Sequence, residues 1–238
     1  MIEAFGLSDP GCVRPNNEDY FIIDTDSGIF VLADGMGGVN GGEFASHLGA
    51  ERLYEFLTSP PATDGVPLLE QAFIEANWAI REAAKTRPEL DGMGTTLLVA
   101  HQLDNGSFEI GSVGDSRAYL VSKGQLSRVT EDQTWLAEVG SRLGLSDEAL
   151  RKHPMRHVLT MAVGSMEELR VFSRSLQMST GDQLLLCSDG LHGVLSEKTL
   201  AETLESEKTL PEKAHYLIEA AKVAGGPDNV TVLLIQLV

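Results

Sequence analysis

The pattern of apolar and polar positions predicts a chain built mostly of short strands, with helices in two separate pairs. Runs that are apolar or alternate with period two, bounded by Gly, Asn and Asp turns, indicate the strands. Apolar residues at helical spacing indicate helices at 43–57, about 69–83, 196–204 and 211–222, and Thr209 with Glu212 fits a capping box. The predicted strands are 2–8, 20–24, 29–33, 95–101, 108–113, 118–121, 126–129, 169–176, 183–187 and 230–238.

A long polar stretch, 131–164, separates the later strands and does not fit their pattern. It contains helix-like pieces at 135–143 and 147–152, so we expect a surface excursion or lid beside the strands. Strands and helix pairs are otherwise segregated along the chain, which predicts an α+β fold with layered sheets covered by helix pairs. The 238 residues contain no low-complexity linker, and this predicts a single domain over 1–238.

The charge and the cysteine content exclude several classes of protein. A formal net charge of −17 argues against a surface for nucleic acid or for anionic membranes. Cys12 and Cys187 form neither a disulfide framework nor a zinc spacing, and we expect both to be at least partly buried. Trp78 is expected to serve packing. Because no signal peptide and no apolar run of membrane length is recognisable, we expect a cytoplasmic protein.

Aspartates recur where the predicted strands end. Asp34 follows the apolar run 29–33 and precedes a glycine-rich segment, whose tight turns bring the backbone close to a ligand. Asp115 and Asp189 stand at comparable strand ends, and Asp228 stands just before the final apolar strand. Four carboxylates in one cluster repel one another unless cations neutralise them. Carboxylate and carbonyl oxygens are the ligands that hard metal ions prefer, so the pattern predicts a metal site.

A predicted hairpin extends this acidic cluster. If 20–24 pairs with the strand that ends at Asp34, then Glu18 and Asp19 lie at the same end as Asp34. The glycine-rich segment has other interpretations: such turns are common without a metal, but no Gly-Lys-Ser/Thr follows to make a P-loop, and an acidic strand end would repel a pyrophosphate. His153 and His157, four residues apart, could bind metal from a helix, although a proline between them opposes this.

Six short motifs, in order, resemble those of the metal-dependent protein serine/threonine phosphatases of the 2C class, the PPM family, and in particular its compact bacterial members. Each motif is weak alone, but together they cover nearly the whole chain at the family's spacing. The motifs are Arg14 with Asn17-Glu18-Asp19, Ala33-Asp34-Gly35-Met36-Gly37-Gly38, Gly92-Met93-Gly94-Thr95-Thr96, Val113-Gly114-Asp115-Ser116-Arg117, Cys187-Ser188-Asp189-Gly190 and Asp228-Asn229-Val230-Thr231.

The resemblance implies a central β-sandwich of two antiparallel sheets flanked by pairs of antiparallel helices, in α-β-β-α layers, with a flap near 131–164. It also implies a site for two Mg²⁺ or Mn²⁺ ions at one edge of the sandwich, and a third, weaker site. The resemblance implies that Asp34 bridges the two ions and that Asp189 and Asp228 are ligands of one of them. The carbonyl of Gly35 is the implied ligand of the other ion, with Glu18 and Asp19 in or just behind its shell. Asp115 and Asp189 are implied at the third site.

The activity implied by the resemblance is hydrolysis of phosphoserine and phosphothreonine monoesters, by in-line attack of a water that bridges the two ions. Arg14 would hold the substrate phosphate with its guanidinium fork and, with Asp34, act in catalysis. Met36 stands where animal members carry a histidine proposed as general acid, while Gln133 and Val39 replace histidines common among relatives. No implied ligand is missing, but the source of the leaving-group proton is open.

Two other interpretations are considered for this chain. A phosphoprotein-binding module of the same fold that has lost catalysis would not need an intact ligand set. A structural acidic or Ca²⁺-binding protein would leave Arg14 without a role, and no EF-hand loop is present. The expected partners are phosphorylated proteins, the products of serine/threonine kinases, with neither nucleic acid nor membrane. We expect the chain to act as a monomer.

Overall fold

Two antiparallel sheets lie face to face in the computed structural model of the chain, which describes residues 1–37, 41–59, 68–104, 106–140, 150 and 153–238. One sheet has the strand order β1-β11-β10-β7-β8; the other has the order β2-β3-β5-β6-β9, with β4 paired to β3. The strands are β1 Ile2–Asp9, β2 Asp19–Asp24, β3 Ile29–Met36, β4 Gly94–Thr95, β5 Leu97–Asp104, β6 Ser107–Val113, β7 Arg117–Ser122, β8 Gln125–Arg128, β9 Phe172–Gln177, β10 Gln183–Cys187 and β11 Val230–Leu237.

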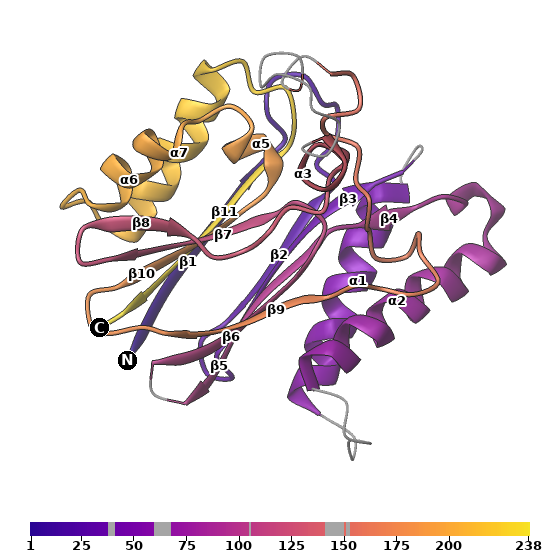
Figure 1. Cartoon of the computed structure of the whole chain (residues 1–238), viewed down its shortest axis with the longest axis horizontal. Helices are drawn as coiled ribbons and strands as arrows, with labels where there is room; N and C mark the ends of the chain where they lie inside the picture. Colours follow the sequence, from indigo (N-terminus) through magenta and orange to yellow (C-terminus); the bar gives the residue numbers. More distant parts are fainter. Residues whose placement is uncertain (38–40, 60–67, 105, 141–149, 151–152) are drawn as a thin grey trace.

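Helices cover the outer face of each sheet, as Figure 1 shows. Helices α1 and α2 pack on the sheet that contains β3, and α6 and α7 pack on the sheet that contains β11. The resulting layers are helix, sheet, sheet and helix, as predicted. The helices are α1 Gly41–Thr58, α2 Leu68–Thr86, the short 3₁₀ helix η1 Pro88–Leu90, α3 Trp135–Glu138, α5 Asp189–His192, α6 Glu197–Leu204 and α7 Leu210–Val223.

Strand β3 is buried on both faces, which explains why its sequence is continuously apolar rather than alternating. Phe30 and Leu32 pack between the two sheets, in the central core. Ile29 and Val31 pack on the other side, in the core beneath α1 and α2. Successive side chains of a strand point to opposite faces, so Asp34 follows Leu32 toward the space between the sheets. The strand thus delivers a carboxylate to the edge of the sandwich.

The hairpin of β2 and β3 has the register that the sequence predicts. Asp19 lies directly opposite Asp34, and the pairing runs back to Asp24 opposite Ile29. Two carboxylates directly opposite each other on neighbouring strands are destabilising unless another group compensates their charge. The hairpin therefore brings Asp19 and Asp34 together within the acidic cluster.

The four long helices agree with the prediction to within a few residues. Thr209 and Glu212 form the expected capping box, in which the hydroxyl of Thr209 accepts from the Glu212 amide and the Glu212 carboxylate accepts from the Thr209 amide. The strand predicted over 95–101 is divided at Thr96, because β4 and β5 pair with different parts of β3. The strand predicted over 169–176 begins only at β9.

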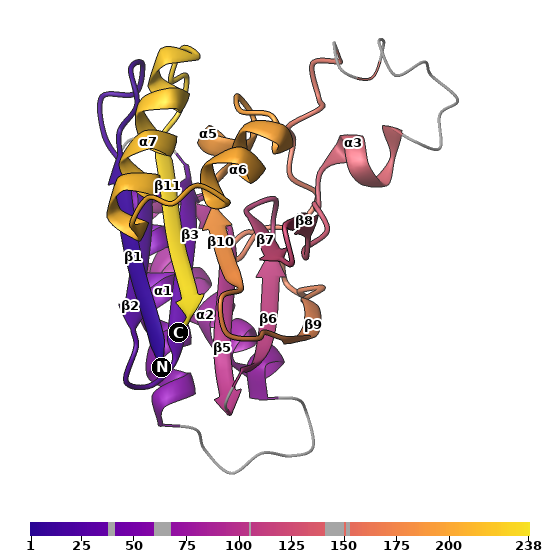
Figure 2. The same ribbon diagram turned by 90° about the vertical axis from the view of Figure 1, so that its left-hand side faces the viewer.

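The polar stretch 131–164 leaves the sheets and returns to them through a narrow neck. Thr134 and Leu159 form an isolated antiparallel bridge, and the amide of Trp135 donates to the carbonyl of Val158 at 2.8 Å. Figure 2 shows α3 standing out beyond β7 and β8. The predicted helix over 135–143 is present as α3, which ends at Glu138. The helix predicted over 147–152 falls almost wholly outside the described residues.

Two other predictions need correction, and the possibility of a helical metal site at His153 and His157 is not realised. Cys12 is exposed, whereas Cys187 is buried in β10 as expected. Trp78 is 61% exposed on α2, so it does not serve the packing role that its size suggested. His153 and His157 do not lie on a helix: the ring of His153 stacks on Trp135, with 4.2 Å between ring centroids. The position of Val39 lies outside the residues described.

The two ends of the chain meet at the end of the sandwich away from α3 (Figure 1). β1 and β11 pair along their whole length, from Ile2 opposite Leu237 to Asp9 opposite Val230. The amide of Val238 donates to the carbonyl of Met1 at 2.9 Å, beyond the last pair. In the described parts of the chain, no helix combines the length and the apolar character needed to cross a bilayer.

Candidate active site

A pocket of about 550 Å³ opens at the edge where β3, β6 and β10 end. Its wall combines strand ends, loops and the neck of the polar stretch. The lining residues are Arg14, Glu18, Asp34, Gly35, Met36, Gly37, Thr96, Asp115, His157, Val158, Leu159, Asp189 and Asp228. The structure thus brings seven of the eight predicted site residues to this wall, and Asp19 lies directly behind it.

Asp34 is held by its backbone, which leaves its carboxylate for other partners. Its amide donates to Thr96 Oγ1 at 3.0 Å, and its carbonyl accepts from the Thr96 amide at 2.9 Å and from Thr95 Oγ1 at 3.0 Å. Thr96 Oγ1 is also hydrogen-bonded to Ser116 Oγ at 2.8 Å, next to Asp115. One pair of threonines therefore ties the Asp34 strand to the loop that carries Asp115.

The glycine after each of two site aspartates is required by close packing of backbones. A Cβ on Gly35 would lie 2.1 Å from the carbonyl oxygen of Gly42, at the start of α1. A Cβ on Gly190 would lie 1.9 Å from the carbonyl oxygen of Asn229. Real side chains do not tolerate such contacts, so the repeated Asp-Gly pattern lets a second segment pass directly against each aspartate.

Asp19 is buried, and only one of its two carboxylate oxygens is satisfied. Asp19 Oδ2 accepts from Thr231 Oγ1 at 2.6 Å and from Ser188 Oγ at 2.8 Å. Asp19 Oδ1 is buried and has no hydrogen-bond partner. A buried polar atom without a partner is uncommon in folded proteins and calls for a cation or a water. This orphan oxygen is direct evidence that the acidic cluster suits a metal ion.

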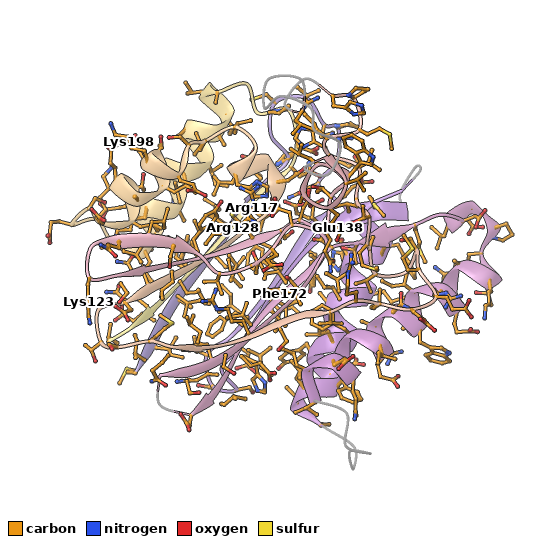
Figure 3. All side chains as sticks on the ribbon, viewed as in Figure 1. Arg117, Lys123, Arg128, Glu138, Phe172 and Lys198 are labelled. Atoms are coloured by element: carbon orange, nitrogen blue, oxygen red, sulfur yellow. The ribbon has the colours of Figure 1, made fainter. Side chains whose placement is uncertain are left out.

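Asp115 is backed by a second group of charged side chains. Arg117 makes a two-pronged ion pair with Asp132, at 2.9 and 2.6 Å, and Arg128 reaches the same carboxylate at 3.4 Å. Figure 3 shows Arg117 and Arg128 beside each other on the β7–β8 hairpin. His192 Nε2 donates to the carbonyl of Asp115 at 2.9 Å. Asp115 is therefore positioned from behind by groups that do not enter the pocket.

Gln133 joins this backing to the base of the polar stretch. Its Oε1 accepts from the Gly114 amide at 2.8 Å, and its Nε2 donates to the carbonyl of Arg170 at 2.6 Å. Its own amide donates to the carbonyl of Gly114 at 3.0 Å. The glutamine therefore links the loop before Asp115, the start of the polar stretch and the segment that follows the stretch.

The electrostatics of the cluster show an excess of negative charge. Burial is the largest cause in each case, and it raises the pKa of Asp19 to about 7, of Asp115 to about 8 and of Asp189 to about 6. The pKa of Asp34 is raised well above its usual range by burial and then by the neighbouring carboxylates, beginning with Asp19. Carboxyl groups with pKa values raised in this way bind a cation readily, because the cation offsets the repulsion between their negative charges.

Arg14 forms an ion pair with Asp228 at the pocket wall. Its Nη2 lies 2.8 Å from Asp228 Oδ2, and its side chain remains 53% exposed. The hydrogen bond to Asp228 and the charge of Asp228 raise the pKa of Arg14 further above its usual value. One contact of this kind leaves further N–H groups of the fork for an incoming anion.

Glu18 lies on the pocket wall against the start of α1. A Cβ on Gly42 would lie 2.7 Å from its carboxyl carbon. Its amide donates to Asn229 Oδ1 at 2.8 Å, and its carbonyl accepts from the Gly35 amide at 3.1 Å. Burial raises the pKa of the Glu18 carboxyl, as it does for the aspartates. Glu18 therefore stands beside Gly35, as the resemblance implied.

The donor set suits divalent ions that keep part of their water shell. Over the described ranges, no three His, Cys, Asp or Glu side chains converge into a preformed cage. Mg²⁺ is usually bound by one or two carboxylates and several waters rather than by an all-protein cage. The orphan oxygen of Asp19 and the open pocket fit ions of this kind.

Several residues of the site were not predicted from the sequence. Ser188 and Thr231 orient Asp19, and Asn229 bridges the chain segments around Glu18 with hydrogen bonds to the carbonyls of Pro10 and Asn16. These three residues belong to the motifs given in the sequence analysis, but a serine, a threonine or an asparagine does not by itself indicate a role in positioning a carboxylate. His157 reaches the pocket from the neck, and no local pattern indicated this.

The chain matches the family model described as protein phosphatase 2C over residues 14–222. The chain belongs to the protein phosphatase 2C family. It is 36% identical over 231 residues to the serine/threonine protein phosphatase PstP of Mycobacterium tuberculosis, a match that covers 97% of this chain and 44% of PstP. It is also 36% identical over 236 residues to the serine/threonine phosphatase stp of Listeria monocytogenes, covering 96% of this chain and 93% of that protein. The chain thus spans less than half the length of PstP.

Solved structures of the protein phosphatase 2C family confirm the predicted fold. The crystal structure of the M. tuberculosis phosphatase PstP/Ppp superposes with a TM-score of 0.89 at 36% identity, covering 99% of this chain and 98% of that one. The PstP catalytic domain in complex with two manganese ions gives a TM-score of 0.85 at 34% identity, covering 99% and 97%. The named relatives are serine/threonine phosphatases, the class that the sequence predicted, and the PstP catalytic domain is the one described with two manganese ions.

Proposed function

We propose that this chain, as a single phosphatase domain over 1–238, removes phosphate from phosphoserine and phosphothreonine in proteins, using the pocket at the edge of its sandwich. One observation carries the proposal. The partly buried Asp34 and Asp189 line a pocket that also presents Arg14, and the buried Asp19 lies directly behind it with one oxygen that has no partner. Acidic ligands for cations beside a guanidinium that can bind phosphate are the parts that phosphoryl transfer to water requires.

The residues that would hold the ions lie on separate segments, each fixed by neighbouring backbone. Asp34 would be shared by two ions, Asp189 and Asp228 would hold one of them, and the Gly35 carbonyl would hold the other. Glu18 and Asp19 would hold the waters of that second ion. Asp115, across the pocket beside Asp189, would contribute to a third and weaker site. When bound, such ions supply positive charge that polarises the phosphate and lowers the pKa of water.

Arg14 would orient the phosphoryl group. Its exposed guanidinium lies on the pocket wall and is anchored through Nη2 to Asp228. A planar fork can bond two phosphoryl oxygens at once, which fixes the phosphorus in line with its attacking water. The neck residues Val158 and Leu159 close the opposite side of the pocket and exclude part of the solvent.

The substrates proposed for the whole protein are phosphoproteins made by serine/threonine kinases. A pocket open at the sheet edge admits a phosphorylated side chain that projects from a larger chain. We further propose that the chain acts as a cytoplasmic monomer, as the sequence indicates. The negative surface disfavours nucleic acid and anionic membranes as partners.

A metal titration tests the proposal directly. Phosphate release from a phosphothreonine peptide and from an aryl phosphate is measured with the purified chain at increasing Mn²⁺ or Mg²⁺, with a chelated sample as control. We expect turnover that saturates with metal and disappears in Asp34→Asn, a variant of equal size. Metal binding by calorimetry without turnover on either substrate would support a binding module and would refute the proposal.

A further inference from the structure

The proposed reaction needs a proton that the metal-binding residues cannot supply. The oxygen leaving phosphorus from serine or threonine is a strongly basic alkoxide, and general acid help is worth about 10²–10⁴-fold in such steps. Asp34, Asp115 and Asp189 would be ionised when they hold cations. Arg14 does not release a proton in proteins. Met36, on the same wall, has no proton to give.

Glu18 and Asp228 belong to the metal-binding set, and the Thr96 hydroxyl is already hydrogen-bonded to the Asp34 amide and Ser116 Oγ. His157 is the one imidazole among the described residues that line the pocket. It is brought there by the neck rather than by the outer part of the excursion. The carbonyl of the next residue, Val158, accepts from the Trp135 amide at 2.8 Å, and the amide of Val158 donates to the carbonyl of Met155 at 3.0 Å. The Thr134–Leu159 bridge fixes the following turn. His157 therefore faces the acidic cluster from a tethered position.

The other five histidines of the chain are occupied elsewhere. His192 lies behind Asp115, and its Nε2 proton is used on the Asp115 carbonyl. None of the five is among the residues that line this pocket. His47 stacks on Tyr20, His101 lies partly buried in β5, His153 stacks on Trp135, and His215 stacks on Phe5 and bonds the Pro211 carbonyl.

We propose that His157 is a catalytic residue that donates a proton to the departing serine or threonine oxygen. The inference rests on the proposed function. In this step the bond between phosphorus and the ester oxygen breaks, its electron pair stays on that oxygen, and the oxygen takes the imidazolium proton to leave as an alcohol. The incoming water supplies the new oxygen on phosphorus. Neutral His157 then regains a proton from solvent, to which its ring is exposed.

The charges around His157 suit a group that must change protonation during turnover. Partial burial, and then the positive charge of Arg156 beside it, hold the pKa of His157 below its usual range. Across the pocket stand Arg14 and the carboxylates that would bind the ions, and no carboxylate on the neck itself lines the pocket. A bound phosphate dianion adds negative charge and favours the imidazolium when the proton is needed.

Two substrates with different leaving groups test the assignment. An aryl oxide leaves without a proton, whereas a threonine alkoxide needs one. We expect His157→Asn to lower kcat on a phosphothreonine peptide by roughly 10²-fold while changing kcat on an aryl phosphate less than about threefold, at saturating Mn²⁺. Equal fractional losses on the two substrates, or no loss on the peptide, would overturn the proposal. If the wild-type chain turned over neither substrate, the proposed function itself would have failed.

A matched variant and a pH profile separate catalysis from structure. His153→Asn alters the other histidine of the same segment, which stacks on Trp135 outside the pocket wall, and we expect kcat to change little on either substrate. With a general acid at His157, kcat on the peptide should fall as pH rises through the pKa of His157. That falling limb should be absent in His157→Asn and on the aryl phosphate. A peptide profile unchanged by the substitution would assign the proton to another donor and refute the proposal.

Discussion

The two walls of the pocket are built in different ways. One wall consists of strand ends whose backbones are locked: Asp34 alone has three backbone hydrogen bonds to Thr95 and Thr96. The other wall, from His157 to Leu159, depends on a few bonds at the neck, and Val158 there is 46% exposed. The first wall has the precision that metal chemistry demands. The second is attached at one point and can differ in sequence without disturbing the sheets.

The largest expected effect comes from removing a carboxylate of the locked wall. Asp34→Asn and Asp189→Asn should each lower kcat by roughly 10³-fold or more on both peptide and aryl phosphate, because they remove a cation ligand and leave the fold intact. Steady-state kinetics at saturating Mn²⁺, with circular dichroism to verify folding, measures this. Substantial Mn²⁺-dependent turnover by either variant would contradict the proposed centre.

The second-largest effect is expected from changes to Arg14, which is proposed to hold the substrate phosphate. Arg14→Ala should lower kcat/KM by about 10- to 100-fold, since a charge-assisted hydrogen bond contributes about 1.5–3 kcal/mol. Arg14→Lys should restore little of this loss, because an ammonium group cannot make the forked contact. Calorimetric Mn²⁺ binding should change much less than catalysis in both variants. A lysine variant with wild-type kcat/KM would reduce Arg14 to a surface cation.

A smaller effect is expected behind the locked wall. Thr231→Val removes one of the two hydroxyl groups that orient Asp19, and it should weaken Mn²⁺ binding by about 10-fold, as loss of such supporting partners generally does. Thr130→Val is a suitable control, since it removes another buried hydroxyl, one that accepts from the Ala118 amide. Equal metal affinities in the two variants would show that Asp19 has no part in the metal site.

The same wall predicts how stability depends on pH. Burial raises the pKa of Asp19 to about 7 and that of Asp115 to about 8, so between pH 6.5 and 8.5 the folded, metal-free protein binds more protons than the unfolded chain. Its stability should therefore fall as pH rises through this range. Histidines that burial keeps neutral in the folded state affect the stability of the protein only at lower pH. Thermal unfolding with a chelator should show Tm falling by a few degrees.

Saturating Mn²⁺ should reverse this dependence, because the ions bind the ionised carboxylates of the folded state only. Asp115→Asn, which cannot ionise, should flatten the fall seen without metal. A metal-free Tm that rises between pH 6.5 and 8.5 would show that these carboxyls do not have raised pKa values.

The smallest effect is expected on the second wall of the pocket, from His157 to Leu159, which is tethered at the neck. Trp135→Leu removes the ring that stacks on His153 near the neck, a contact typically worth about 0.5–1.5 kcal/mol. We expect KM for a phosphopeptide to rise by roughly two- to tenfold, with little change for an aryl phosphate, which has no peptide chain to contact Trp135. A larger loss on the aryl phosphate would show that the two walls are not independent.

The contrast between the walls also explains what the sequence could predict. The locked wall follows local rules: an apolar run ending in Asp-Gly predicted the place of Asp34, and hairpin geometry predicted Asp19 opposite it. The tethered wall depends on how a long excursion returns to the sheets, and no local rule sets that return. For this reason His157 was considered as a ligand on a helix, whereas the structure places it in a turn at the pocket.

Other differences have the same physical origin. The size of Trp78 suggested burial, but a helix that covers a sheet buries only one face, and its outward face accepts an exposed ring. Cys12 precedes Arg14 on the loop between β1 and β2, where its amide donates to the Gly226 carbonyl at 2.8 Å and its residue remains exposed. The supporting hydroxyls of Ser188 and Thr231 became recognisable only when three distant segments met at Asp19.

The pairing of the first and last strands places both ends of the chain together, far from the pocket. Because Met1 and Val238 are hydrogen-bonded to each other at the far end of β1 and β11, a strand of eight residues, about 26 Å of chain, separates them from the pocket end. A short peptide could join these ends, and new ends could be opened in the surface turn between β7 and β8. Such a circular permutant should retain phosphatase activity, and reporters fused at the present ends should not obstruct a phosphoprotein substrate.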